Sequence, residues 1–440
     1  MEKINQSKID QLRKKYPKFI YEKYSFKVAR NNLEIVFYFK VEPNIFFKPK
    51  IIVKNINKKR LAQIEEKTIN NLIFHLGLIE IPSYWKATCS PIIEIKAGFL
   101  NKEQVDWWKD LILKGMGQFF YENKINWKKR DFLFFQIENH CLDKFKTESN
   151  HRLLEEKTLV PLGGGKDSIV TLEKLKEQGK EIGCFLVNPT KTMKEIVGVA
   201  KINDLVVIER KIDPALLQLN KKGFLNGHTP ITAVLSFLSV FSALLFGYKN
   251  IAFSNEKSAN EGNVKYLGEI INHQWSKSSE FENKFCFYCK KYLAKNINYF
   301  SYLRKYTELE ISKMFVSYPQ YFSVFSSCNV VLAKKMNKKW CGNCPKCLFV
   351  YLILYPFLEK EKLLKIFGND LFENRNLLSI MKGLVGSKEI KPFECVGTKK
   401  ESQKAFLMSL KKAEKEGKTP FLLKKVKIIE ILKKNKKRLR

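Results

Sequence analysis

One short segment combines residue types that can bind a chain of phosphates. It consists of Gly163, Gly164, Gly165, Lys166, Asp167 and Ser168. The glycines let the backbone pass close to a bulky anion, and their N–H groups, with the start of the following helix, can donate to phosphate oxygens. Lys166 adds a positive charge and Ser168 a hydroxyl donor. Asp167 suits this position only if a cation offsets its charge, as Mg²⁺ on ATP would. An ordinary strand-to-helix turn is the structural alternative.

The order of these residues distinguishes between two nucleotide-binding loops. A Walker A loop ends in Gly-Lys-Ser/Thr, whereas here Asp167 separates the lysine from the serine. The segment instead resembles the pyrophosphate-binding loop (PP-loop) of the N-type ATP pyrophosphatases. That superfamily cleaves ATP between the α- and β-phosphates and passes AMP to a carboxylate or carbonyl oxygen. The resemblance implies that ATP and Mg²⁺ are required.

Four cysteines have the spacing of a metal site: Cys328, Cys341, Cys344 and Cys347. Four thiolates suit tetrahedral zinc, and a zinc site with no open position is structural. Such a site would hold the C-terminal helical part of the protein in place. Cys286 and Cys289 form a further Cys-x-x-Cys pair and are alternative ligands. An iron–sulfur cluster and a redox-active pair are the alternative chemistries.

A polar segment, residues 254–263, follows an apolar run. It includes Asn255 and Glu256, whose amide and carboxylate suit contacts to a metal ion, a ribose or a substrate. Its glycine and polar composition argues against a helix. A further polar segment, residues 271–282, includes Asn272, which we also assign to substrate or Mg²⁺ contacts.

Three side chains are candidate proton carriers. His273 and Lys277 are four positions apart and would share one face if their segment were helical. His228 precedes the long apolar run Pro230–Tyr248, and Asn226 or Thr229 could be the N-cap of a helix there, with Pro230 at its first position. A purely structural role is the alternative for each histidine.

The elements that would position these residues alternate between strand and helix from Thr158 onward. Short apolar strands are expected at 159–162, 182–187, 205–208 and 251–253. This alternation predicts an α/β fold with a doubly wound parallel sheet. Ligands of such sheets bind at the carboxyl ends of the strands, where both the glycine segment and residues 254–263 would lie.

The two ends of the chain differ from this middle region, which we place at residues 158–383. Residues 1–157 predict an N-terminal α+β domain that shapes the substrate pocket. Its expected elements are a hairpin at 24–41, a strand at 46–53, a helix at 59–76, a helix starting at Asn101 with a capping box to Gln104, and a strand at 132–137. Residues 384–440 form a basic segment in which Lys424–Arg440 is an amphipathic helix or a solvated tail.

The formal net charge is +36 over 440 residues. Its lysines are spread along the whole chain, so we interpret the charge as a solvated surface and expect no nucleic acid partner. The clustered cysteines and the polar first residues suit a cytoplasmic protein without a secretory signal. The uncharged run Pro230–Tyr248 could span a membrane, but its helically spaced serines predict a buried core helix and no membrane span.

Several of these segments together resemble one known family over roughly Gly98–Phe357. The segments are 107–123, Gly163–Ser168, Ser254–Asn263, Asn272–Glu282 and Cys341–Cys347. They are similar to the bacterial UDP-N-acetyl-α-D-muramoyl-L-alanyl-L-glutamate epimerases. The Ser-Asn-Glu and Asn-His-Gln segments are the most discriminating. The resemblance implies a PP-loop (HUP-like) fold with a zinc-bearing C-terminal part.

The resemblance also implies an isomerase that uses ATP to epimerise the terminal L-glutamate of a UDP-N-acetylmuramoyl dipeptide. The carboxyl group would become an acyl-adenylate, with AMP and diphosphate released. A muramoyl-alanine L-glutamate ligase would be the functional partner. The role would lie in peptidoglycan precursor synthesis, and hence in cell-wall biogenesis, cell shape and cell division.

The alternatives come from the same superfamily and from outside it. The cysteine group also resembles that of the 7-cyano-7-deazaguanine synthases, so a nitrile-forming or carboxylate-amidating enzyme is the nearest alternative. A tRNA-modifying enzyme would use the basic tail. A non-catalytic RNA-binding protein would need a decayed nucleotide loop, and the intact Asp167 and Ser168 argue against decay.

Overall fold

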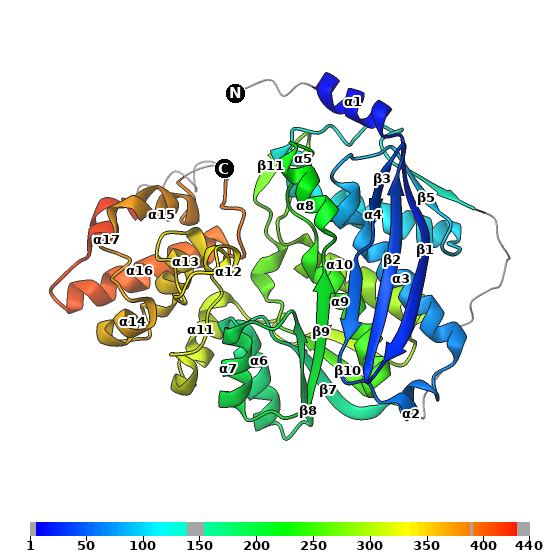
Figure 1. Ribbon diagram of the computed structural model, residues 1–440. Helices are drawn as coiled ribbons and strands as arrows, with labels where there is room; N and C mark the ends of the chain where they lie inside the picture. The colour runs from blue at the N-terminus through cyan, green and yellow to red at the C-terminus, as the bar shows by residue number, and fades with distance from the viewer. Residues whose placement is uncertain (1–5, 139–153, 388–389, 429–440) are drawn as a thin grey trace.

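One large sheet forms the centre of the molecule, as the ribbon of the computed structural model shows (Figure 1). The structure describes residues 6–138, 154–387 and 390–428. Within them the sheet has eleven strands. Ten follow the order β13-β10-β7-β8-β9-β4-β2-β1-β5-β6, and β3 pairs with β2. A separate two-stranded sheet consists of β11 (Val264–Tyr266) and β12 (Glu269–Ile271).

Five adjacent strands of the sheet are parallel and carry the glycine segment. They are β7 (Glu155–Pro161), β8 (Ile182–Val187), β9 (Leu205–Lys211), β10 (Tyr248–Phe253) and β13 (Asn298–Ser301). The chain runs from β7 outward to β8 and β9, and then returns to β10 on the other side of β7. This reversal leaves a switch point between β7 and β10, the place where open α/β sheets bind ligands. The expected parallel α/β sheet and its four strands are confirmed.

The other half of the sheet comes from the first part of the chain. Its strands are β1 (Lys18–Ala29), β2 (Asn32–Val41), β3 (Ile45–Phe47), β4 (Lys50–Val53), β5 (Ile92–Ile95) and β6 (Phe134–Ile137). The expected hairpin is confirmed, because β1 and β2 pair antiparallel up to Ala29 and Asn32. β4 pairs antiparallel with β9, and Ile52 lies opposite Glu209. The first region therefore continues the sheet of the second, and the boundary at residue 157 stays a prediction.

Helices pack on this sheet and contribute to the hydrophobic core of the protein. They are α1 (Gln6–Lys15), α2 (Lys58–Leu61), α3 (Glu66–Trp85), α4 (Lys102–Gly115), α5 (Gly117–Glu122), α6 (Lys166–Glu177), α7 (Lys191–Ala200), α8 (Pro214–Lys221), α9 (Ile231–Phe246) and α10 (Ser279–Tyr288). The capping box at the start of α4 is confirmed. Asn101 Oδ1 accepts from the Gln104 N–H at 2.9 Å, and Gln104 Oε1 accepts from the Asn101 N–H at 3.1 Å.

The long apolar helix α9 is buried in the core. It packs against α3, β7 and β10, and its serines 236, 239 and 242 are fully buried. Ser236 Oγ donates to the Thr232 carbonyl at 2.8 Å, and Ser239 Oγ donates to the Ser236 carbonyl at 2.8 Å. Pro230 is the N-cap itself, with no side-chain cap, so the expected cap by Asn226 or Thr229 is wrong. No helix among the described residues is long and apolar enough to cross a bilayer.

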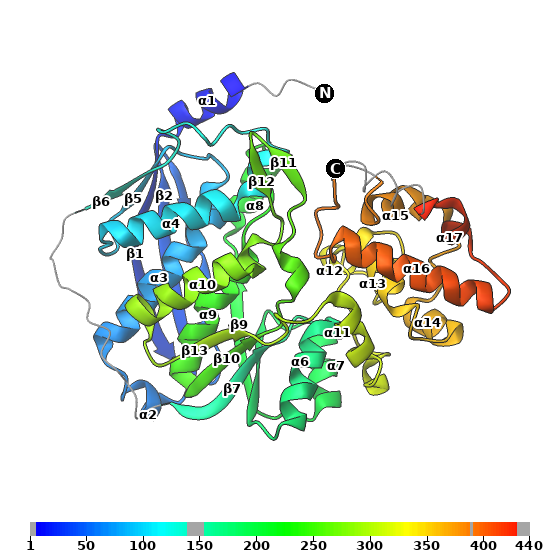
Figure 2. The ribbon, with the colours of Figure 1, turned by 180° about the vertical axis from the view of Figure 1, so that it is seen from behind.

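The last part of the chain forms a group of helices beside the sheet, visible in both views (Figures 1 and 2). Its members are α11 (Glu308–Phe315), α12 (Asn329–Ala333), α13 (Pro345–Leu354), α14 (Lys360–Phe367), α15 (Leu378–Leu384), α16 (Lys399–Lys415) and α17 (Phe421–Lys425). Helix α13 packs against α11, α15 and α16, while α11 packs against α6. Of the expected helix Lys424–Arg440, most lies outside the described residues.

Candidate active site

The glycine segment forms an open turn between β7 and α6. Gly164 has a φ of +92°, and a Cβ there would lie 3.1 Å from the Ser326 carbonyl oxygen. Both facts require glycine at this position. A Cβ at Gly163 would meet nothing within 4 Å, so one side of the turn is open. Gly165 is the N-cap of α6 and, as a glycine, provides no side-chain acceptor for the first N–H groups of the helix. The turn therefore presents backbone donors at a helix N-terminus, as anion binding needs.

Lys166 lies inside the protein, under the turn. Its side chain is 5% exposed and its ammonium forms ion pairs with both Asp167 and Glu308. Burial alone would lower the pKa of Lys166, but the two carboxylates raise it above its ordinary value. Lys166 therefore carries a permanent positive charge at the base of the turn. Ser168 Oγ donates to the Gly165 carbonyl at 3.0 Å, so this hydroxyl braces the turn.

Glu308 was not identified from the sequence. It begins α11 and its side chain is 2% exposed. Burial raises the pKa of Glu308 to about 7, and the negative charge of Asp167 adds to the effect, whereas Lys166 opposes it. The pKa of Asp167 is lowered instead. Its burial alone would raise this pKa, but the charges of Lys166 and of other nearby cations outweigh that effect. Asp167 and Glu308, which both pair with Lys166, therefore differ in proton affinity.

The segment after β10 reaches the same end of the sheet. Asn255 and Glu256 are 4% and 3% exposed. Asn255 Nδ2 donates to Ser301 Oγ at 3.0 Å. The expectation that this segment is not an α-helix is confirmed, since residues 257–260 make only a single 3₁₀ turn.

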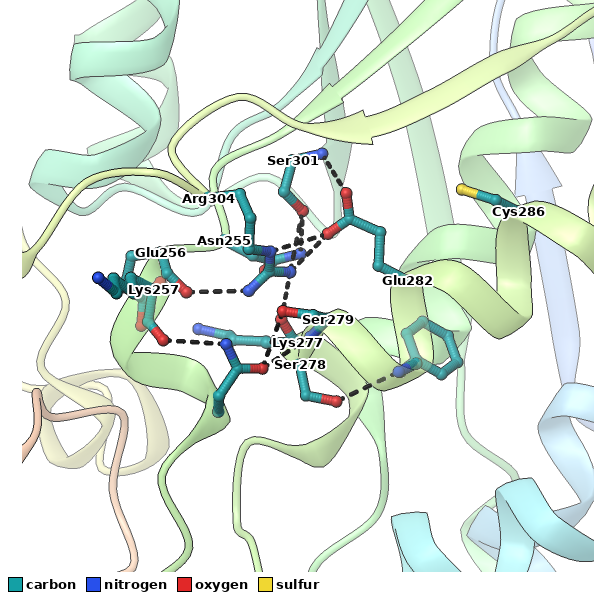
Figure 3. Close-up of polar contacts among 12 residues, drawn as sticks. Asn255, Glu256, Lys257, Lys277, Ser278, Ser279, Glu282, Cys286, Ser301 and Arg304 are labelled. Carbon is teal, nitrogen blue, oxygen red and sulfur yellow. Dashed lines mark hydrogen bonds and ion pairs between the residues drawn. The ribbon is translucent and has the colours of Figure 1, made fainter.

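Arg304, which the sequence did not single out, holds two of these loops together (Figure 3). Its guanidinium donates to the Glu256 carbonyl at 2.9 Å and to the Lys277 carbonyl at 2.6 Å. Its charge is balanced by Glu282, whose other oxygen accepts from the Ser301 N–H at 2.9 Å. Five fixed donors make arginine suited to joining several acceptors in this way. Arg304 therefore fixes the backbone position of Lys277.

Lys277 lies within electrostatic reach of Asp167 in the glycine turn. Burial alone would lower the pKa of its ammonium, but negatively charged neighbours raise it above the ordinary value: Cys395, Glu256 and Asp167. The segment of His273 and Lys277 is not an α-helix, so the two residues do not share a helical face. Residues 275–277 form only a 3₁₀ turn, and His273 precedes it.

His273 is held by hydrogen bonds on several sides. Its backbone N–H donates to Asn263 Oδ1 at 2.8 Å, and its Nδ1 bonds to Gln118 Oε1. The His228 ring lies beside it, with 4.6 Å between the ring centroids. Burial, followed by the charges of His273 and Lys86, lowers the pKa of His228 to about 3. The two predicted histidines are thus brought together, and His228 is neutral near pH 7.

Asn272 has a structural part in this loop. Its Nδ2 donates to the Ala259 carbonyl at 2.8 Å, and its Oδ1 accepts from the Gln274 N–H at 2.8 Å. Both ends of the amide are therefore engaged within the loop. They tie residues 272–274 to the segment that follows β10.

The four predicted metal ligands lie together in the protein interior. The Sγ atoms of Cys328, Cys341, Cys344 and Cys347 are all within 4.8 Å of one another. Three of the separations are 3.9, 3.6 and 3.4 Å. Sulfurs around a tetrahedral zinc with Zn–S bonds of about 2.3 Å would be roughly 3.8 Å apart, so the group fits such an ion. A structural metal site of four cysteines is therefore possible here.

The alternative ligands lie elsewhere. Cys286 Sγ contacts the Tyr299 carbonyl at 3.2 Å, and Cys289 Sγ contacts the Ala294 carbonyl at 3.8 Å. Neither belongs to the four-cysteine group, and Cys286 lies apart from the Arg304 contacts (Figure 3). As alternative metal ligands these two residues are excluded by position.

The four-cysteine group and the glycine turn are neighbours. The Ser326 N–H donates to the Gly164 carbonyl at 2.9 Å, two residues before Cys328. Lys346 lies between Cys344 and Cys347 in the sequence, and its ammonium donates to the Cys395 carbonyl. Its charge also lowers the pKa of Asp167. Sequence reasoning missed Lys346 and Cys395, although the position of Lys346 inside the cysteine motif was a usable signal.

Comparison with known proteins gives matches along most of the chain. The MurL N-terminal domain matches residues 10–302, and the MurL C-terminal domain matches residues 324–438. A relative in Xanthomonas oryzae pv. oryzae, named UDP-N-acetyl-alpha-D-muramoyl-L-alanyl-L-glutamate epimerase, is 35% identical over 346 residues, which are 77% of this chain and 74% of that protein.

Two further relatives carry the same name. Those of Salinispora tropica and of a Micromonospora species are 40% and 39% identical, over 56% of this chain in each case. The matched part spans about half the length of these two proteins, 53% and 55%. Epimerases are isomerases, so the names agree with the isomerase prediction and do not favour the deazaguanine-type or RNA-modifying alternatives.

Proposed function

Because the chain belongs to the MurL epimerase family, we propose that it epimerises the terminal L-glutamate of UDP-N-acetylmuramoyl-L-alanyl-L-glutamate to D-glutamate in an ATP-dependent reaction. We also propose that the nucleotide binds at a PP-loop formed by the glycine turn. One observation carries the proposal. The Lys277 ammonium is close enough to the Asp167 carboxylate for each to shift the pKa of the other. This proximity supports a single site that includes the proposed nucleotide loop and Lys277.

The chemistry explains why such a reaction would consume ATP. A free carboxylate resists loss of its α-proton, because two negative charges would then share one small group. Transfer of AMP to the carboxylate neutralises it and gives an acyl-adenylate, with diphosphate as the other product. The α-proton of this ester-like group is more acidic, and nearby donors can stabilise the enolate that forms. Hydrolysis then releases AMP and the epimerised product.

The residues divide into two groups under this proposal. The N–H groups of Gly163, Gly164 and Gly165 hold the phosphates, and the permanent charge of Lys166 attracts them. The carboxylates of Asp167 and Glu308 would hold Mg²⁺, which neutralises phosphate charge when bound. Glu308 fits this role because burial and the charge of Asp167 raise its pKa even beside Lys166, so that a further cation would stabilise its ionised form.

The second group acts on the dipeptide. Asn255 and Glu256 contact substrate or Mg²⁺, while His273, Lys277 and His228 surround the reacting carbon. The raised pKa of Lys277 favours it as a proton donor or as a cation that stabilises the enolate, and disfavours it as the base. Zinc would have a structural role only. The product would serve peptidoglycan precursor synthesis in the cytoplasm, downstream of a ligase that adds L-glutamate.

Solvent exchange tests the proposal directly. Purified protein is incubated in deuterated water with the UDP-muramoyl dipeptide, with and without ATP and Mg²⁺. The D-glutamyl product should carry deuterium at its α-carbon only when ATP and Mg²⁺ are present, and AMP with diphosphate should form alongside. Asp167→Asn should abolish AMP formation and exchange together. Exchange without ATP, or ADP in place of AMP, would contradict the proposed function.

A further inference from the structure

Cys395 lies in the site although no sequence pattern marks it. It belongs to the segment between α15 and α16 that returns from the helical group to the loops after β10. The Asn263 Nδ2 donates to the Pro392 carbonyl at 2.8 Å, and the Lys391 N–H donates to the Asn263 carbonyl at 3.2 Å. These bonds bring the Cys395 Sγ to 3.9 Å from His273 Nε2. Cys395 as a residue is partly exposed.

The hydrogen bonds of His273 determine which of its nitrogens faces the thiol as an acceptor. Gln118 Nε2 donates to Glu122 Oε1 at 2.8 Å, so the carbonyl oxygen of this amide is the atom that faces His273 Nδ1. An oxygen only accepts, and Nδ1 must therefore carry the proton. In the neutral ring the remaining nitrogen, Nε2, is then an acceptor directed at the Cys395 thiol. A neutral imidazole placed in this way can accept the proton of the thiol and leave a thiolate.

Two lysines add positive charge around the same sulfur. Burial alone would raise the pKa of Cys395, but Lys277 first, and then His273 and Lys346, lower it to about 6. Cys286 provides the contrast within the same chain, because burial and the charge of Glu282 raise its pKa to about 11. At pH 7 Cys395 is thus mainly a thiolate, and Cys286 is a thiol.

We propose that Cys395 is a catalytic residue of the epimerisation, in which its thiolate removes the α-proton of the activated glutamate. The inference rests on the proposed function. In this step the Cα–H bond breaks, the proton passes to sulfur, and the electron pair moves into the acyl carbonyl to give an enolate. A protonated group on the opposite face then returns a proton to the α-carbon. Both proton carriers re-equilibrate with water.

A proton carrier is needed for exchange but not for adenylation, and this difference provides the test. Cys395→Ala and Cys395→Ser are compared with wild type, with Cys286→Ala as the matched control. Each protein is assayed for ATP-dependent AMP release and for deuterium at the glutamate α-carbon. Both Cys395 variants should still release AMP, with the L-configuration retained, while exchange falls by about 10²–10⁴-fold, the usual contribution of a general base. The control should match wild type in both assays.

Three results of these assays would overturn the role proposed for Cys395. Undiminished exchange in either Cys395 variant would overturn the assignment while leaving the proposed function intact. Joint loss of AMP release and exchange in both variants would assign Cys395 a structural part instead, and would also overturn it. If wild type itself shows no ATP-dependent exchange, the proposed function fails and the role of Cys395 fails with it.

Peptide mapping after brief iodoacetamide treatment gives a further measurement that does not depend on turnover. Cys395 should be modified faster than Cys286 at pH 7, and its rate should fall as the pH drops below about 6. Equal rates for the two thiols at pH 7 would contradict a thiolate at position 395.

Discussion

Lys166 and Glu308 form a buried ion pair that joins the first turns of α6 and α11, 142 positions apart in the sequence. The pair lies directly beneath the glycine turn, and Asp167 shares the same ammonium. A pair of this kind holds the proposed phosphate loop against the helical group. Loss of Lys166 would therefore leave two carboxylates without their cation, and loss of Glu308 would leave the buried ammonium with Asp167 as its one remaining partner of the two.

Removal of the Glu308 carboxylate should therefore destabilise the fold. We expect Glu308→Ala to lower the free energy of unfolding by about 3 kcal/mol, the lower end for breaking a buried pair, because Asp167 still contacts Lys166. Urea unfolding followed by circular dichroism measures the change. The double variant Lys166→Met/Glu308→Leu should recover part of the loss, since the only partner that it leaves without the ammonium is Asp167, whose side chain is 25% exposed. Equal destabilisation in the single and double variants would refute this account.

The cysteine group should carry one metal ion. Purified protein should contain about one zinc per chain, and Cys344→Ser should lose the metal and unfold at a lower temperature. Cys286→Ser, which removes a thiol outside the group, is the control and should keep the metal. Because Ser326 bonds to Gly164, metal loss should also weaken ATP binding. A metal-free protein whose melting temperature is unaffected by Cys344→Ser would exclude the site.

Arg304 should matter for rate through the position of Lys277. Arg304→Lys keeps the charge but cannot reach both carbonyls and Glu282 together, so the loop should shift. We expect epimerisation to slow by about 100-fold, as misplacement of roughly 1 Å near a reacting centre can do. Arg375→Lys, in the helical group, is the control. Steady-state assays of both variants decide the point, and similar rates would show that the clamp is dispensable.

His228 should remain neutral across the physiological range. Its pKa is lowered to about 3, whereas an unfolded histidine titrates near 6.5. Between these values the unfolded chain binds a proton that the folded chain does not, so this residue makes the protein less stable as the pH falls below 6.5. Nuclear magnetic resonance of the ring should show no His228 titration between pH 5 and 8, with His228→Gln identifying the signal. A midpoint near 6.5 would contradict the buried environment. Unfolding measurements should also show that His228→Gln loses less stability than wild type between pH 7 and pH 5.

Much of the local structure was determined by the sequence alone. The glycine turn, the Asn101 capping box, the β1–β2 hairpin and the buried helix α9 each depend on residues a few positions apart. Such features follow from backbone geometry, periodicity and short-range hydrogen bonds, which a sequence displays directly. The four-cysteine group was also predictable, because three of its ligands lie within seven residues.

The composition of the site was decided by tertiary structure. Glu308 and Cys395 reach Lys166 and His273 across 142 and 122 positions, and no local pattern announces either contact. His273 and Lys277 share no helical face, because Asn263 Oδ1 and Asn272 Oδ1 accept from backbone N–H groups in a loop there. The pairing of β4 with β9, which joins the strands of the first region to the expected parallel sheet, likewise depends on distant partners. Burial and neighbouring charge set the proton affinity of each group, and both exist only once the chain has folded.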